Sequence, residues 1–501
     1  MEKTEVVVVG SGPTGLTLAN ELALAGVDVV VLEKLSERSG QSKALNLQPR
    51  SAELLHMRGL IEGAKQRALA TLADGHFAGL HVPLAYDRLR TRHPYQVCVP
   101  QGKVEEVLEE RFAEYRGRVR YGHELLDFTQ DDAGVTATVR GPDGDEHTLR
   151  AAYLVGCDGG RSVVRKLLGV GFPGTDANAY GVVADVLLGR TSDAVPTEWT
   201  STVELFARSG SAGRLVTLLP LAEPGLYWLV SVPGARPETR DAPVSREELE
   251  ADVREFYGDE VEIAEVRSAT RFTDASRMVD RYRVDRVLLA GDAAHIHVPA
   301  GGQGMNIGIQ DAMNLGWKLA AEVRGRAPAG LLDSYHAERH PVAEGVLENT
   351  RGQGMIMFGV MNPAVAALRT LLVDLMALPE VNRHLAGMIS GLDMRYPVAG
   401  ADAGSSHELL GAPMPDVELA DGRWVSDLQH GGHGLLLTTD PALADAARPW
   451  ADRVDVVLLP EIPLPGEGAD ALLVRPDGYV CWAAPDKDLE TALATWFGTP
   501  A

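Results

Sequence analysis

Apolar runs and glycine-rich turns alternate over the first 33 residues of the chain. Residues 5–9 form a short β-branched run, which is typical of a strand buried on both faces in a parallel sheet. Residues 16–25 have the composition of a helix that ends near Gly26, and residues 27–32 form a second apolar run followed by Glu33. This order predicts a βαβ unit with a GxGxxG turn after its first strand.

The same apolar texture returns further along the chain. Residues 153–156 and 286–290 are apolar runs, so we expect both in the same parallel sheet. Between about 176 and 275 the strand-like segments alternate, which predicts a mostly antiparallel sheet inserted into the first domain. Other strands are predicted at 135–139, 147–151, 181–188, 214–219 and 227–232, and helices at 50–57, 104–115, 310–322, 331–351 and in much of 363–385.

The C-terminal part of the chain has the pattern of a small α/β domain of its own. A linker-like stretch, residues 400–406, separates it from the preceding helices. Within it we predict strands at 434–437 and 454–459, a helix at 441–452, a hairpin around 476–478 and a closing helix at 488–497.

Composition narrows the class of protein. Hydrophobic residues make up 45% of the 501 and charged residues 23%, which is typical of a soluble globular protein of two or three domains. The net charge of −23 argues against nucleic-acid binding. Three scattered cysteines, Cys98, Cys157 and Cys481, indicate a reducing, cytoplasmic compartment. The N-terminus lacks a secretory signal and prolines interrupt the apolar stretch 215–232, so no membrane segment is predicted.

The first turn carries the chemistry of dinucleotide binding. Gly10 permits a tight turn, Gly12 lets the backbone approach a pyrophosphate, and Gly15 lets helix and strand pack closely. Glu33, 18 residues after Gly15, is placed to accept hydrogen bonds from a ribose diol. A glycine-rich turn beside a surface glutamate is the bland alternative, but strand, helix, strand and acid in register favour a dinucleotide site.

A second glycine-rich site lies between residues 286 and 306. The strand there delivers Gly291 and Asp292 to a cleft, where Asp292 is placed to accept a hydrogen bond from a polyol such as ribityl. Gly301, Gly302 and Gly304 allow backbone to lie against a flat ligand, and helix N–H groups near Met305 and Asn306 favour negative charge on a ring. His295 and His297 lack a third ligand at suitable spacing, so no metal site is predicted; His295 is placed near the flat ligand by position only.

These motifs resemble the class A, single-component FAD-dependent aromatic hydroxylases related to para-hydroxybenzoate and phenol hydroxylases, over roughly residues 1–400. Gly291-Asp292 matches their GD motif, and residues 157–165, with Asp158 and Arg161, match their DG motif. Lys43 stands where many members have an arginine beside the flavin diphosphate. The resemblance implies these FAD-binding residues: Gly10, Gly12, Pro13, Thr14, Gly15, Glu33, Lys34, Lys43, Gln101, Leu125, Asp158, Arg161, Gly291, Asp292, Pro299, Gly301, Gly304, Met305 and Asn306.

The resemblance also implies the architecture. The expected fold is α/β, with an FAD-binding, doubly wound Rossmann-like domain (1–75, 101–175 and 276–400, with trailing helices), an inserted, mostly antiparallel substrate-binding sheet (76–100 and 176–275) and a C-terminal thioredoxin-like domain (401–501). Because Cys481 is the single cysteine of the last domain, no CxxC motif exists there, and a structural or dimer-contact role is favoured over a redox role. The resemblance is also compatible with a homo-oligomer that forms through this domain.

The implied activity is that of a monooxygenase. Residues 42–45 and 335–341 resemble the hydroxylases of polyketide and rifamycin pathways. The expected reaction uses FAD, NADPH or NADH, and O2 to hydroxylate a polycyclic aromatic substrate through a flavin C4a-hydroperoxide, with no catalytic side chain assigned. The alternatives are Baeyer–Villiger insertion, a rifamycin-type monooxygenase, and a flavin-binding protein without catalysis. Candidates for an apolar substrate wall, with core packing an equal alternative, are Phe206, Tyr227, Trp228, Met355, Met357 and Met361.

Overall fold

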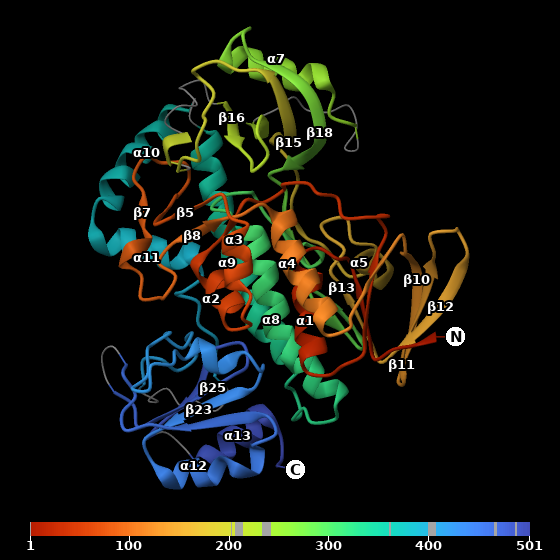
Figure 1. Ribbon diagram of the computed structural model, residues 1–501, viewed down its shortest axis with the longest axis vertical. Helices are drawn as coiled ribbons and strands as arrows, with labels where there is room; N and C mark the ends of the chain where they lie inside the picture. Colours follow the sequence, from red (N-terminus) through yellow and green to blue (C-terminus); the bar gives the residue numbers. More distant parts are fainter. Residues whose placement is uncertain are drawn as a thin grey trace.

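The computed structural model describes residues 2–201, 203–205, 214–232, 242–359, 362–398, 407–464, 468–485 and 488–500. An antiparallel sheet lies at one end of the molecule and the C-terminal domain at the other, with a helix-covered parallel sheet between them (Figure 1). The predicted linker at 400–406 lies outside the described residues.

The central sheet has six strands in the order β20-β21-β13-β2-β3-β9, all parallel except β20. Its bounds are β2 (Val6–Val9), β3 (Val29–Glu33), β9 (Val119–Tyr121), β13 (Tyr153–Gly156), β20 (Arg283–Val284) and β21 (Val287–Leu289). The apolar runs of β2, β13 and β21 are fully buried, because both faces of the sheet are covered. This confirms the parallel strands predicted at 5–9, 153–156 and 286–290.

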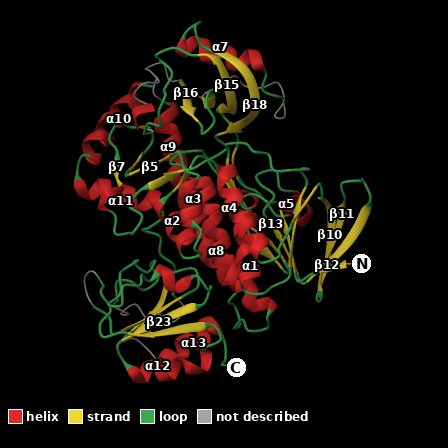
Figure 2. Ribbon diagram, in the orientation of Figure 1, coloured by secondary structure: helices red, strands yellow, loops and turns green. Residues whose placement is uncertain are grey.

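Three helices pack against this sheet side by side (Figure 2): α1 (Pro13–Leu24), α4 (Gln101–Glu114) and α8 (Gln303–Val323). On its other side lies a four-stranded sheet in the order β1-β12-β11-β10. Its bounds are β1 (Glu2–Lys3), β10 (Glu124–Asp131), β11 (Gly134–Arg140) and β12 (Glu146–Ala151). The segment Pro142-Asp143-Gly144 lies between β11 and β12, which correspond to the strands predicted at 135–139 and 147–151.

The antiparallel sheet has the strand order β16-β17-β15-β18. Its strands are β15 (Tyr180–Arg190), β16 (Leu215–Pro220), β17 (Leu226–Val232) and β18 (Glu262–Thr273), and α7 (Arg246–Tyr257) covers one face. Alternation along β15 sends Val182 and Val186 toward α7 and Val183 toward the opposite face. The sheet therefore has an outer core of its own and an inner face turned to the parallel domain.

Four helical predictions differ most from the structure in their bounds, and one of them, the helix predicted at 441–452, ends at Ala447. Helix α8 begins at Gln303 rather than 310, because the glycine-rich turn leads directly into the helix. Helix α9 (Ser334–Phe358) continues past the predicted end at 351. The predicted helix over 363–385 is two helices, α10 (Pro363–Met376) and α11 (Pro379–Ser390), because Pro379 starts a new first turn. The remaining helices of this part are α2 (Pro49–His56), α3 (Ile61–Gln66) and α5 (Val163–Leu168).

The segment 76–100 was predicted to join the substrate sheet, and its strand pairing differs. Strand β8 (Gln96–Cys98) pairs with β4 (Asn46–Leu47) and β5 (Ala70–Leu72), both from the FAD-binding part of the chain. Other short strands are β6 (Asp74–Gly75), β7 (Leu84–Ala85), β14 (Gly174–Thr175), β19 (Ser276–Met278) and β22 (His295–Ile296). Short pairings of this kind have no strong hydrophobic period, so the sequence pattern does not reveal them.

The C-terminal domain is a four-stranded sheet in the order β24-β23-β25-β26 with a helix layer against it. Its elements are β23 (Gly434–Thr438), α12 (Pro441–Ala447), β24 (Val454–Leu458), β25 (Ala471–Val474), β26 (Val480–Ala483) and α13 (Leu489–Phe497). Strands β23 and β24 are parallel, whereas β25 and β26 form the hairpin predicted around residues 476–478. The thioredoxin-like fold class is confirmed.

Among the described residues, no single helix has the length and apolar composition needed to cross a membrane. Helices α9 and α10 meet that criterion only when taken together, and they are bent by 114° with respect to each other.

Candidate active site

One large cavity, of about 810 Å³, lies between the parallel sheet and the inner face of the antiparallel sheet. At one end its wall is formed by the turn after β2, the end of β3 and the DG and GD motifs. At the other end the wall is apolar and comes mainly from β16, β17 and β18. Ligands of open parallel sheets bind outside the carboxyl ends of the strands, and this cavity occupies that place.

Each of the three positions in the first turn requires glycine for a different steric reason. A Cβ at Gly10, whose φ is +104°, would lie 2.5 Å from the carbonyl oxygen of Cys157. A Cβ at Gly15 would lie 2.0 Å from the carbonyl oxygen of Gly10, so helix and turn pack in direct contact. A Cβ at Gly12 would meet nothing within 4 Å, and Gly12 lines the cavity. Gly12 thus leaves room for a ligand rather than for the protein.

Glu33 is held in place by the same turn. Its Oε2 accepts hydrogen bonds from the backbone N–H of Ser11 (3.1 Å) and from the Ser11 hydroxyl (3.0 Å). Its Oε1 accepts from the N–H of Leu35 at 3.0 Å. The carboxylate therefore lines the cavity in a fixed orientation, as a ribose-binding acid requires.

The DG motif places a second carboxylate on the cavity. Oδ2 of Asp158 accepts hydrogen bonds from the N–H groups of Val163 (2.6 Å) and Val164 (3.2 Å), at the start of α5. Oδ1 of Asp158 is buried and has no hydrogen-bond partner among the described residues. A buried oxygen of this kind costs free energy unless a ligand or water satisfies it.

The GD motif depends on contact with the first turn. Gly291 has a φ of +60°, and a Cβ there would lie 2.6 Å from the Thr14 hydroxyl oxygen. Asp292 is exposed within the cavity. A larger residue at position 291 would push the strand end away from α1 and carry Asp292 with it.

A buried network of charged and polar groups, centred on Asp311, holds the backbone of the GD motif. Asp311, on α8, accepts hydrogen bonds from His295 Nε2 (2.7 Å), from the Gly291 N–H (3.1 Å) and from Arg339 Nε (2.6 Å). Burial by itself would raise the pKa of the Asp311 carboxyl, but the charges of Arg339 and His295 outweigh burial and lower it. The sequence prediction for His295 is corrected here: its ring faces Asp311 and not the cavity.

The N-terminus of α8 faces the cavity. Gly302 precedes the helix in the left-handed conformation (φ 62°), and Gln303, Gly304 and Met305 line the wall. Asn306 does not line the wall. Its side chain holds the backbone of neighbouring segments, because its Nδ2 donates hydrogen bonds to the carbonyls of Asn46 (3.2 Å) and Gly302 (2.7 Å). Free N–H groups at a helix start favour an anionic ligand atom.

The cofactor residues named from the sequence come together with four exceptions. Gly15, Gly291, Gly301 and Asn306 do not line the cavity, and each instead shapes a turn or holds one. The others, which all line it, are Gly10, Gly12, Pro13, Thr14, Glu33, Lys34, Lys43, Gln101, Leu125, Asp158, Arg161, Asp292, Pro299, Gly304 and Met305.

Some of the residues predicted to form the substrate wall line the cavity, and others point to the opposite face of their strand or helix. Trp228 and Met357 line the cavity. Tyr227 does not, because neighbouring residues of a strand point to opposite faces and Tyr227 packs under α7. Met355 is 67% exposed on the opposite side of α9 from Met357, so its prediction as pocket wall is also wrong. Phe206 and Met361 lie outside the described residues.

Sequence reasoning missed most of the apolar wall. Val230 and Val232 continue the inner face from Trp228 at a period of two, a signal that was available once the strand and the face of Trp228 were known. Phe272 on β18 and Trp199 are also part of the wall, and nothing local in the sequence points to them. Their positions are tertiary consequences of sheet pairing.

His297, which the sequence analysis considered only as a metal ligand, is a further polar group on the cavity. Its Nδ1 lies 2.8 Å from the carbonyl oxygen of Val298, which can only accept, so Nδ1 carries the proton and Nε2 is an acceptor. Burial lowers the pKa of His297, which keeps the ring neutral. The neutral His297 ring therefore offers Nε2 as a hydrogen-bond acceptor at the cavity.

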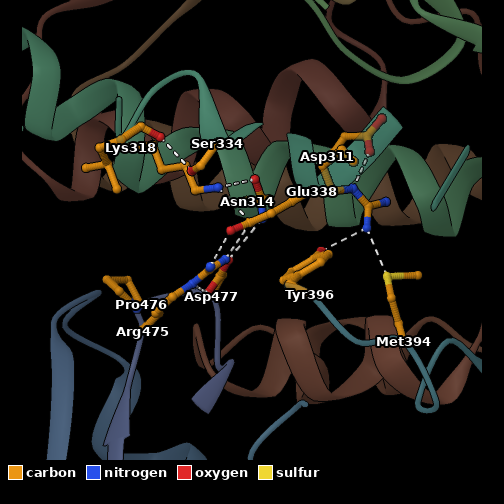
Figure 3. Close-up of polar contacts among 12 residues, drawn as sticks. Asp311, Asn314, Lys318, Ser334, Glu338, Met394, Tyr396, Arg475, Pro476 and Asp477 are labelled. Atoms are coloured by element: carbon orange, nitrogen blue, oxygen red, sulfur yellow. Dashed lines mark hydrogen bonds and ion pairs between the residues drawn. The ribbon is translucent and has the colours of Figure 1, made fainter. Parts of the chain in front are cut away.

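A second buried network joins the C-terminal domain to α8 and α9 (Figure 3). Arg475 donates to both oxygens of Glu338 (2.6 and 2.9 Å) and pairs with Asp477. Lys318 also donates to Glu338 at 2.7 Å. Burial by itself would raise the pKa of Glu338, but Arg475 and Lys318 lower it to about 2, and burial lowers the pKa of Lys318 to about 8. Two cations and two anions therefore balance at this domain contact.

This lowered pKa predicts an acid-sensitive contact. The folded-state pKa of Glu338 is below its ordinary value of 4.5, so its stabilising contribution is complete above about pH 4.5 and is lost as the pH falls toward 2. A shift of this size corresponds to about 3 kcal/mol. We expect the thermal unfolding temperature of the wild type to fall as the pH is lowered from about 4.5 toward 2. Glu338→Gln should start less stable and show a smaller pH slope; an unchanged slope would contradict the assignment.

Known protein families and relatives match this chain over nearly its whole length. A family model described as "FAD binding domain" matches residues 3–350, and one described as "Aromatic-ring hydroxylase, C-terminal" matches residues 407–500. A 12-dehydrotetracycline 5-monooxygenase/anhydrotetracycline 6-monooxygenase of Streptomyces rimosus subsp. rimosus is 47% identical over 99% of both chains. A rifampicin monooxygenase of Streptomyces venezuelae is 44% identical over 99% of this chain and 98% of its own.

The structural comparison gives the same answer. The solved structure of the OxyS anhydrotetracycline hydroxylase from Streptomyces rimosus covers 100% of both chains with a TM-score of 0.89 and 46% identity. The chain therefore belongs to the class A FAD-dependent aromatic hydroxylases. Within this class it is a flavin-dependent monooxygenase of the aromatic polyketide branch.

Proposed function

We propose that this enzyme hydroxylates a polycyclic phenol of the anhydrotetracycline type, with NADPH or NADH as the electron donor and O2 as the oxygen donor. The single observation that carries the proposal is the continuity of the cavity, which runs from the dinucleotide motifs to an apolar wall within a volume of about 810 Å³. The named activities of the 47% and 44% identical relatives support this substrate class. The three buried free cysteines support our placing of the enzyme in the cytoplasm.

The residues present fit FAD. Gly12 leaves open space beside a helix start, Glu33 offers a fixed acceptor, and Asp158 has an unsatisfied buried oxygen. We propose that these groups hold the adenosine and diphosphate, that Asp292 accepts from the ribityl chain, and that the start of α8 faces the flavin ring. FAD, when bound, supplies electron transfer from the nicotinamide and activation of O2.

The chain's own contribution is to orient the ring and exclude water. Trp228, Val230 and Phe272 present an apolar face to the substrate and limit water beside the reacting atoms. His297 Nε2 is placed to accept a hydrogen bond from a phenolic hydroxyl, which raises the electron density of the ring to be hydroxylated. A rifamycin-type substrate or ring insertion would use the same groups, so the outcome depends on how the substrate lies.

The decisive experiment combines cofactor content with product analysis. The purified protein should be yellow, and oxidation of NADPH should accelerate when a polycyclic phenol such as anhydrotetracycline is added. Mass spectrometry of the products should show a gain of one oxygen with the ring skeleton intact. A colourless protein that takes up no FAD would sink the proposal, and a ring-expanded or cleaved product would favour the alternative reaction.

Asp292 offers a direct test of the cofactor assignment. Asp292→Ala removes a carboxylate that faces the cavity, and we expect FAD affinity to fall about tenfold because a hydrogen bond to a charged acceptor is lost. Asp259→Ala is the matched control, since Asp259 is an exposed aspartate remote from the cavity. Equal FAD affinities in a fluorescence titration of the two variants would contradict the role of Asp292.

Cys481 tests whether the C-terminal domain takes part in redox chemistry. Its side chain is buried between β25, β26 and α13, and burial raises the pKa of its thiol, so the reactive thiolate is suppressed. We expect Cys481→Ala to keep turnover within about twofold of the wild type. Loss of substrate-stimulated NADPH oxidation in a folded variant would show that the thiol takes part.

A further inference from the structure

The segment 39–45, between β3 and β4, belongs to the FAD-binding part of the chain but is held by the antiparallel sheet. The N–H of Ser42 donates to Asp185 Oδ2 at 3.0 Å, and the carbonyl of Ser42 accepts from the Trp228 indole N–H at 2.6 Å. The Gln41 side chain accepts from the Thr270 hydroxyl at 3.0 Å. The strands β15, β17 and β18 thus each form one hydrogen bond with this segment. Two of these bonds reach Ser42 and the third reaches Gln41.

The next residue, Lys43, projects into the cavity at its polar end. Lys43 is exposed there, beside Gln101 and Glu105, whereas Ser42 is only 7% exposed. Because both backbone polar groups of Ser42 are bonded to the sheet, the direction in which Lys43 leaves the backbone is fixed by the sheet and not by β3. Lys34 and Arg38 line the cavity as well, so cations and the carboxylates of Glu33 and Glu105 both face it.

Asp185 is an unusual residue to find at this contact. It lies on the inner face of β15 and is 6% exposed. Its Oδ2 also accepts from the Ser268 hydroxyl at 3.0 Å, and its Oδ1 is buried without a hydrogen-bond partner among the described residues. Burial raises the pKa of this carboxyl. A buried acid with one unsatisfied oxygen is unfavourable for stability, so its value to the protein lies in what it holds.

We propose that Asp185 is a positioning residue for cofactor binding: by holding Ser42, it fixes Lys43 at the diphosphate end of the cavity, so that the substrate-binding sheet helps to set the affinity for FAD. Trp228 is part of the same device, because its indole N–H holds the Ser42 carbonyl while its ring lines the substrate end. The inference rests on the proposed binding of FAD in this cavity. It adds a physical connection between the substrate wall and a cofactor-facing cation.

A double-mutant cycle on FAD affinity tests the proposal. FAD is titrated into apoprotein of the wild type, Asp185→Ala, Lys43→Met and the double variant, and flavin fluorescence is followed. We expect Lys43→Met to raise the Kd about tenfold and Asp185→Ala about fivefold, with the double variant no weaker than Lys43→Met alone. Independent, multiplicative effects would overturn the proposal. A wild type that binds no FAD would instead refute the proposed function itself.

Two further variants separate positioning from general damage. Ser268→Ala removes the other hydrogen bond of Asp185 without touching Ser42, and its FAD affinity should equal that of the wild type. Asp185→Asn keeps an acceptor for the Ser42 N–H and should restore the affinity lost in Asp185→Ala. If Asp185→Ala does not fold, Trp228→Phe removes the other bond to Ser42 and enters the same cycle with Lys43→Met; additivity there would also overturn the proposal.

Discussion

Replacing Arg475 by methionine is expected to lower the free energy of unfolding by about 3–5 kcal/mol, because the substitution leaves buried carboxylates without their main cation. Arg475 is 2% exposed and bonds both oxygens of Glu338 as well as Asp477. After its removal, Lys318 alone balances Glu338, and the cost of desolvating Asp477 is no longer offset. Urea unfolding followed by tryptophan fluorescence measures the change.

An exposed ion pair provides the control for this prediction. Arg190 pairs with Glu262 at 2.8 Å, but the two side chains are 66% and 53% exposed. Arg190→Gln is therefore expected to change stability by less than about 0.5 kcal/mol. If Arg475→Met proved as stable as Arg190→Gln, the network of Figure 3 would contribute nothing to the attachment of the C-terminal domain.

Replacing Gly12 by valine is expected to weaken FAD binding about 100-fold while leaving the fold intact. The backbone at Gly12 is extended (φ −70°, ψ 179°), a conformation that valine adopts readily, and an added Cβ meets no protein atom within 4 Å. The side chain would instead fill the space that a pyrophosphate needs. FAD titration and the thermal unfolding of the apoprotein measure the two effects separately.

Variants of two other glycines serve as controls for this prediction. Gly345→Ala, on the exposed face of α9 with open space around it, should leave FAD affinity unchanged. Gly10→Ala should damage folding as well as binding, because its Cβ would lie 2.5 Å from the Cys157 carbonyl oxygen and its φ is +104°. Unfolding of the Gly12→Val apoprotein at the temperature of Gly10→Ala would show that Gly12 serves the fold and not the ligand.

The sequence by itself determined the βαβ unit, the apolar runs that form the parallel strands and the residues of the dinucleotide motifs. Those features are local: a buried strand reads as an unbroken apolar run such as Val6–Val9, and a turn that must approach a phosphate requires glycine at fixed spacing. Such signals lie within about 30 residues of one another, so the chain needs no tertiary partner to reveal them.

The tertiary structure alone decided which residues share the cavity and what supports them. Tyr227 and Trp228 are adjacent in sequence and face opposite sides of a sheet, and only the pairing of β17 with β15 settles which side is inner. The bond from Asp185 to Ser42 spans 143 residues, and Arg475 reaches Glu338 across 137. Contacts of this length arise from packing after the local elements have formed, and no periodicity in the sequence encodes them.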